Sequence, residues 1–278
     1  MLSEIAHSAP GLVVASAVMA TLGTLGGIGG AVLLVPLLVL LGYDPWVAAP
    51  LGMLSVGAGS LAAAPRQLDA GVAHQRLGVT LEIPSSVGAI AGALLAGVVA
   101  RSVLVRFLAA VALCAAVFGG RRKGLRNQPH QMFVEEPAGE WPGTLAGAYH
   151  LDGEVVPYQA RRVAAGLVAM VGAGLVSGVA GVGGGFIKTP VMSEIMHVPV
   201  KVAAATSTFT VGITSATTLL VYAGQDRIDT ISGAAVVFGG LLGGTIGAWL
   251  AGRLAPTRVR TALSVLLASV ALVMAIQG

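Results

Sequence analysis

Long apolar runs separated by short polar segments set the pattern of the chain. A helix that crosses a bilayer needs about 20 mostly apolar residues. Two of the runs, 11–41 and 163–196, are longer than that, and glycines interrupt them at 26–30 and 181–185. We predict a pair of half-helices in each interrupted run, at 11–24 and 29–41 and at 163–179 and 184–196. The uninterrupted runs predict further spans at 46–64, 77–99, 102–118, 202–223, 232–250 and 259–276.

The two glycine interruptions are copies of one motif. Gly181-Val182-Gly183-Gly184-Gly185 is followed by Pro190, and Gly27-Ile28-Gly29-Gly30-Ala31 is followed by Pro36, 154 positions earlier. The order continues downstream, where residues 88–97 and 243–252 are identical at six of ten positions. We therefore predict an internal duplication into two homologous four-segment repeats, each opening with a glycine-broken helix. The repeats are parallel if the broken segments span and inverted if they are re-entrant, and the loop charges leave both arrangements open.

Composition and charge place the chain in a membrane. It is 55% hydrophobic and 10% charged, with a mean hydropathy of +0.87, whereas soluble domains carry about 25% charged residues. This excludes an ordinary globular enzyme and predicts an all-α polytopic membrane protein with about eight transmembrane segments. The basic residues behind the net charge of +4 lie in short loops and read as topology signals, not as a nucleic-acid surface. The single cysteine, Cys114, excludes an internal disulfide.

The domain organisation follows from the one extended polar region. We predict a first transmembrane repeat at 1–119, a polar linker at 120–162 and a second repeat at 163–278. The positive-inside rule predicts a cytoplasmic linker, because it holds the densest basic cluster of the chain. Within it, 143–149 and 154–158 predict a β-hairpin with Asp152-Gly153 as the turn, or else an unstructured linker, since two strands alone are only marginally stable. The basic cluster comprises Arg121, Arg122, Lys123, Arg126, Arg161 and Arg162.

The glycine motifs are candidate anion sites. Where a helix restarts, its first amide N–H groups are unpaired and carry partial positive charge. Gly183, Gly184 and Gly185 are therefore candidate substrate-binding residues, with Gly29 and Gly30 as their equivalents in the first copy. The alternative is close helix packing at small residues four apart. We expect packing to be the role of Gly88 and Gly92 and of Gly239, Gly243 and Gly247.

Two charged residues lie inside apolar runs, Lys188 and Glu82. A charge at the bilayer centre costs about 2.5–3.5 kcal/mol on insertion scales, so it normally faces a cavity or a partner. Lys188 is expected to face a central cavity and bind the anion, or else to snorkel to the interface. Glu82 is expected to pair with Lys188, to titrate as a proton-coupling group, or to lie near the interface. Replacement of Lys188 by Met is expected to leave membrane insertion unharmed.

Hydroxyl groups cluster in the second half. Thr206, Ser207 and Thr208 are candidate ligands for an oxyanion, alongside Lys188 and the amides after Gly183. The alternative for such hydroxyls is bonding between helices or to the carbonyl four residues earlier. The segment 226–229 is predicted to be a charged loop end.

The ordered motifs resemble those of a known family. The doubled Gly-x-Gly-Gly-Gly/Ala…Pro motif and the run Ala-Ala-Ala-Thr-Ser-Thr-Phe-Thr-Val-Gly at 203–212 resemble the sulfite exporter TauE/SafE family of membrane transporters. Residues 145–149 and 156–158 resemble the central insert of one branch. The resemblance covers nearly the whole chain and implies a multi-pass transporter of the bacterial inner membrane that exports small anions, such as sulfite or organosulfonates, without an organic cofactor. Gly52 and Met53 stand where the second copy has Ser207 and Thr208, which weakens the case for polar ligands from the first half.

The sequence contains few features that favour other classes of function. The motifs of zinc proteases, serine hydrolases and phosphate-binding loops are absent from the sequence. An anion channel is the first alternative and an intramembrane enzyme the second. The expected partners are a small anion and the lipid bilayer, with no nucleic acid and no metal. The identity of the anion, the direction of transport, the coupling ion and the oligomeric state, a homo-oligomer included, stay open.

Overall fold

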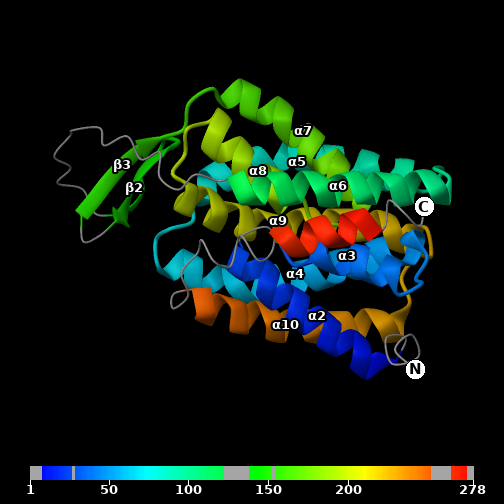
Figure 1. Cartoon of the computed structure of the whole chain (residues 1–278). Coiled ribbons are helices and arrows are strands. Elements are labelled where there is room, and N and C mark those ends of the chain that lie inside the picture. The colour runs from blue at the N-terminus through cyan, green and yellow to red at the C-terminus, as the bar shows by residue number, and fades with distance from the viewer. Residues whose placement is uncertain (1–7, 27–28, 122–137, 152–153, 252–263, 274–278) are drawn as a thin grey trace.

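The computed structural model describes residues 8–26, 29–121, 138–151, 154–251 and 264–273, and every structural statement below concerns these residues. They form a helical bundle with a small sheet beyond one of its ends (Figure 1). The first half of the chain contributes α2 (Ala9–Gly26), α3 (Ala31–Leu40), α4 (Pro45–Asp69), α5 (Gln75–Ala96) and α6 (Arg101–Arg121). The second half contributes α7 (Val163–Ala180), α8 (Gly185–Pro190), the π-helical turn η1 (Val191–Ile195), α9 (Val200–Gly224), α10 (Thr230–Ala251) and a helix at Ser264–Val273.

Both predicted helix breaks are present. The helix α2 ends at Gly26 and α3 begins after Gly30. In the second half, Gly181 and Gly184 flank the break, each with φ of 71°. This is the left-handed region that residues with a side chain rarely adopt, so glycine permits the chain to stop one helix and start another here. Pro190, which has no amide hydrogen, ends α8, and the chain continues as η1.

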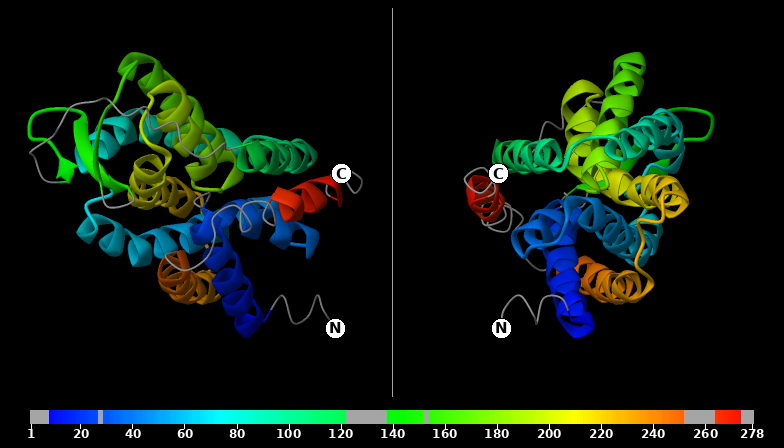
Figure 2. Two further views of the ribbon diagram at one scale, coloured as in Figure 1. Left: turned by 60° about the vertical axis from the view of Figure 1, so that its left-hand side comes forward. Right: turned by 90° about the vertical axis from the view of Figure 1, so that its right-hand side faces the viewer.

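The two halves of the chain interlock. The first helix of each half packs on a long helix of the other: α2 on α10, and α7 on α5 (Figures 1 and 2). Between these pairs, α4 packs against both α9 and α10, and α9 packs against α5. Each half therefore completes its packing only with helices of the other half.

Glycines set the spacing of these helix pairs, as the sequence predicts. A Cβ added at Gly88 would lie 2.1 Å from the carbonyl oxygen of Val171, and one added at Gly243 would lie 2.2 Å from that of Ala17. Both distances are shorter than atoms in contact allow. The backbones of α5 and α7, and of α10 and α2, thus approach as closely as small residues permit in membrane helices.

Five of the described helices, α4, α5, α7, α9 and α10, are long and apolar enough to cross a membrane. The half-helices α2 and α3 and the helix at Ser264–Val273 are apolar but shorter. The span predicted at 259–276 is represented by that helix, and its predicted first residues lie outside the described part of the chain. The prediction of about eight transmembrane segments stays a prediction.

The linker folds into a sheet of three antiparallel strands in the order β1-β2-β3. The predicted hairpin is formed by β2 (Ala146–Leu151) and β3 (Glu154–Gln159), and the sequence did not indicate β1 (Gly139–Glu140). The predicted turn at Asp152-Gly153 lies outside the described residues. The hairpin is not isolated, because Tyr149 packs into a cluster with Leu77 of α5 and Met196 after η1. An unstructured linker is thus wrong for 146–151 and 154–159.

Substitution of Gly243 by alanine should destabilise the protein, because the new methyl group forces α10 away from α2. Overpacking of this kind costs typically about 1–3 kcal/mol. The matched control is Gly172→Ala in α7, where an added Cβ meets nothing within 4 Å and alanine raises helix propensity. Thermal unfolding of both variants in detergent measures the difference. Equal stability of the two variants would contradict this account of the packing.

Candidate functional site

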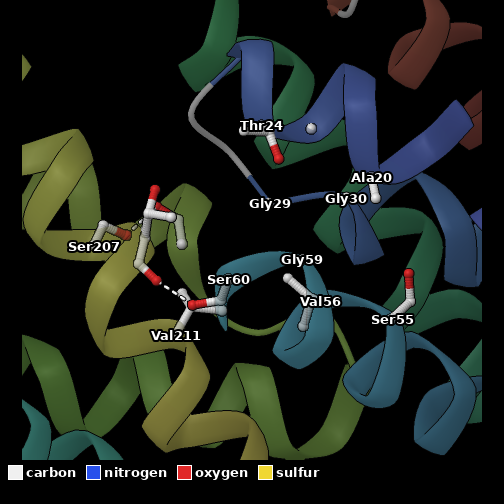
Figure 3. Close-up of a pocket in the computed structure, with 13 residues that line it drawn as sticks. Ala20, Thr24, Gly29, Gly30, Ser55, Val56, Gly59, Ser60, Ser207 and Val211 are labelled. Atoms are coloured by element: carbon white, nitrogen blue, oxygen red, sulfur yellow. Dashed lines mark hydrogen bonds between the residues drawn. The ribbon is translucent and has the colours of Figure 1, made fainter. Parts of the chain in front are cut away.

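A pocket lies where the two helix breaks meet (Figure 3). Its empty volume is about 410 Å³, which includes open space at its mouth. Residues of both halves form its wall, so the pocket depends on the interlocked packing. The lining residues are Ala20, Gly23 and Thr24 of α2, Gly29 and Gly30 at the first break, Ser55, Val56, Gly59 and Ser60 of α4, Gly185 at the second break, and Ser207, Thr208 and Val211 of α9.

Hydroxyl groups give the pocket its polar character. The Ser60 hydroxyl donates to the carbonyl oxygen of Thr208, which joins α4 to α9. The Thr208 hydroxyl donates to the carbonyl of Ala204 at 3.0 Å, within its own helix. The Ser207 hydroxyl faces the carbonyl of Gly185 at 3.5 Å, at the limit of a hydrogen bond. Ser207 can therefore turn toward a bound anion at little cost.

The start of α3 lies beside these hydroxyls. Gly29 and Gly30 line the pocket, and α3 begins at the next residue, Ala31. The first amide groups of an α-helix have no partner within the helix and carry partial positive charge. A pocket with a helix start on one side and hydroxyls on the other suits a small anion.

The structure brings together five of the predicted site residues: Gly29, Gly30, Gly185, Ser207 and Thr208. Gly183, Gly184, Thr206 and Lys188 are not among the residues that line the pocket. A Cβ at Gly183 would lie 2.9 Å from a methyl of Val56, so Gly183 serves close packing behind the wall. The Thr206 hydroxyl accepts a hydrogen bond from the backbone N–H of His74 at 2.9 Å.

The first half also supplies hydroxyl groups to the pocket wall that were not predicted from the sequence: those of Thr24, Ser55 and Ser60. The signal was present in the repeat. At an offset of 155, Ser55 corresponds to Thr210 and Ser60 corresponds to Ser215. The match of residues 55–57 to 210–212 indicates the duplication, but Gly52 and Met53, which face Ser207 and Thr208, favoured the prediction of few polar ligands from the first half.

Lys188 and Glu82 form a buried ion pair. The Lys188 ammonium lies 2.5 Å from Glu82 Oε2, and the two residues are 1% and 3% exposed. The Thr214 hydroxyl accepts from Lys188 and donates to Glu82, and the Ser86 hydroxyl donates to Glu82 Oε1 at 3.3 Å. Of the predicted roles, the pairing is confirmed. A snorkelling lysine is wrong, because the Lys188 side chain is sealed within the protein.

The ion pair lies behind the pocket wall. Thr214 follows the lining residue Val211 by three positions on α9, which is about one helical turn. Lys188 follows the lining residue Gly185 by the same interval on α8. The paired charges are thus near the pocket but do not reach it in this structure.

Arg227 lies in the charged loop end predicted at 226–229, and its side chain packs against the protein. It is 4% exposed, and its guanidinium lies over the rings of Trp46 at 4.6 Å and Tyr222 at 4.2 Å. It also donates twice to the carbonyl oxygen of Trp46. Arg227 therefore fastens the end of α9 to the start of α4, and is a structural residue.

Comparison with known proteins gives one match. No group of His, Cys, Asp and Glu residues that could hold a metal ion is found in the described part of the chain. No curated protein and no solved structure matches the sequence. The family described as Sulfite exporter TauE/SafE matches residues 12–274, which include both glycine breaks, the ion pair and the sheet. With nearly its whole length matched, the chain belongs to the sulfite exporter TauE/SafE family of membrane transporters.

Proposed function

We propose that the protein carries small anions, such as sulfite or organosulfonates, out of the cell across the bacterial inner membrane. The family supports a transporter, and the five long apolar helices support a multi-pass membrane protein. The observation that carries the proposal is the pocket at which the two glycine breaks meet. There the anion accepts hydrogen bonds from the hydroxyl of Ser207 and from the first amides of α3.

The proposal includes two homologous repeats with the pocket between them. Reciprocal contacts support this arrangement. A Cβ on Gly57 would lie 3.1 Å from Ser215, and one on Gly212 would lie 3.1 Å from Ser60. Each residue of these pairs corresponds to one in the other pair at an offset of 155. The crossing of α4 and α9 thus has the same contacts in both directions, as a pseudo-two-fold axis would give.

Proton coupling through Glu82 is the second part of the proposal. With Glu82 ionised, its charge cancels that of Lys188. Proton uptake by Glu82 leaves the ammonium uncompensated behind the pocket wall. An uncompensated positive charge near the pocket attracts an anion bound there. Anion binding and proton uptake would therefore favour each other, and the two would cross the membrane together.

Removal of the Ser207 hydroxyl should weaken anion binding. A hydrogen bond to a charged group contributes about 1.5–3 kcal/mol, so Ser207→Ala should raise the KM roughly 10- to 150-fold. Ser215→Ala is the matched control, since Ser215 lies on the same helix, is buried and does not line the pocket. Transport of sulfite, sulfonates and carboxylates into proteoliposomes measures both. Unchanged kinetics in Ser207→Ala would place the anion elsewhere.

Removal of one ion-pair partner should destabilise the protein, contrary to the expectation from sequence alone. Lys188→Met leaves the Glu82 carboxylate buried without its cation, a loss of about 3–5 kcal/mol. The double variant Lys188→Met/Glu82→Leu removes both charges and should recover most of that stability. Thermal unfolding of the single and double variants in detergent measures the loss. Native stability in Lys188→Met would show that the pair does not form.

Replacement of Glu82 by glutamine should abolish proton coupling. The variant keeps the hydrogen bonds of a neutral side chain but cannot lose or gain a proton. Anion transport by Glu82→Gln should no longer respond to an imposed pH gradient, whereas the native protein should respond. Transport into vesicles with and without the gradient measures the effect. A native response in Glu82→Gln would leave the ion pair with a structural role only.

A further inference from the structure

The three-stranded sheet is fastened to the helix ends that carry the site. Its strands and the residues next to them reach α5, which carries Glu82, α9, which carries Ser207 and Thr214, and the end of η1, which follows Lys188 (Figures 1 and 2). The contacts are Glu140 Oε2 with the Arg76 N–H at 3.0 Å, the Tyr158 hydroxyl with His74 Nδ1 at 2.9 Å, Lys201 Nζ with the His150 carbonyl at 3.3 Å, and the Arg161 N–H with the Met196 carbonyl at 2.9 Å.

His74 is the buried group at the centre of this contact. It caps the start of α5, and its side chain is fully buried. Its backbone N–H donates to Thr206, the residue before Ser207 and Thr208 of the pocket. Its Nε2 atom has no hydrogen-bond partner among the described residues. A charged imidazole in this position would leave one N–H without an acceptor.

The groups around His74 come from every element that packs on it. Glu140 of β1 approaches Nε2 at 3.9 Å and favours the charged form, but the same carboxylate oxygen already accepts the Arg76 N–H. Arg76 of α5 opposes the charge. Tyr158 of β3 is uncharged, because burial raises its pKa above the usual range. Burial is the largest influence and lowers the pKa of His74 below 6.5.

We propose that the three-stranded sheet is a pH-dependent clamp on α5, α9 and η1, and that protonation of His74 releases it. Burial, and the absence of an acceptor within hydrogen-bond distance of Nε2 among the described residues, favour the neutral imidazole over the charged one. In the released state His74 is solvated and binds its proton more readily than in the docked state. The docked state is therefore fully favoured above pH 6.5, the ordinary pKa of histidine. As the pH falls below that value, the equilibrium constant for docking decreases by at most tenfold per pH unit.

Hydrogen exchange of the full chain in lipid nanodiscs tests the clamp independently of transport. Exchange rates at pH 7.5 and 5.5 are compared after correction for intrinsic exchange. In the native protein, protection of β2, β3 and the first turn of α5 should fall up to tenfold at pH 5.5. In His74→Gln, which stays neutral, protection should not change with pH. Tyr158→Phe, which loses the bond to His74, should be less protected at both pH values.

His150→Gln is the matched control, because His150 is an exposed histidine of β2 in the same sheet. It should keep the native pH response. The imidazole proton resonance of His74, assigned by its loss in His74→Gln, gives a second reading. The clamp is disproved if that resonance titrates above pH 6.5, if native protection rises on acidification, or if His74→Gln keeps the native response. None of these outcomes depends on which anion the protein carries.

Discussion

Close approach of helix backbones from opposite halves of the chain is the constraint on which the structure depends. In a bilayer the hydrophobic effect does not drive helices together, so van der Waals packing must hold them. Here α2 meets α10 and α7 meets α5 through glycines that leave no room for a side chain. The pocket exists because these contacts fix where the two breaks lie. A shift of α2 against α10, or of α7 against α5, would separate Gly29 from Gly185 and disrupt the pocket wall that both residues form.

The buried ion pair is a second consequence of that packing. It joins α5 of the first half to α8 of the second, and its strength depends on the exclusion of water by α9 and α7. Two charges removed from water recover the loss only when their geometry is good and further hydrogen bonds satisfy them. Thr214 and Ser86 provide those bonds. Because the ion pair is stable only in this arrangement of the helices, it is suited to stabilise one conformational state of a transport cycle.

Much of the fold could be predicted from the sequence, because the patterns that determine it involve residues close together in the chain. Glycine breaks, apolar runs and the Asp-Gly signal of the hairpin are read from neighbouring residues, and the helices and β2–β3 appear where predicted. The residues of the site could be predicted only in part. Gly185 and Ser207 were found by the chemistry of their motif, whereas Ser60 became a lining residue only through the crossing of α4 with α9. The burial of Arg227 and His74 could not be predicted from the sequence, because it arises from distant segments such as Trp46 and Tyr158.

The pairing of α2 with α10 also governs how the protein is made. These partners are separated by more than 200 residues, and a chain grows at about 5–20 residues per second. The first helix therefore waits roughly 10–40 s in or near the membrane before the helix that covers it has been synthesised. During that interval its small-residue face is open to wrong partners. Assembly of this protein is consequently tied to the order of synthesis, and in a nascent chain stalled before residue 230 the helix α2 would lack its partner α10.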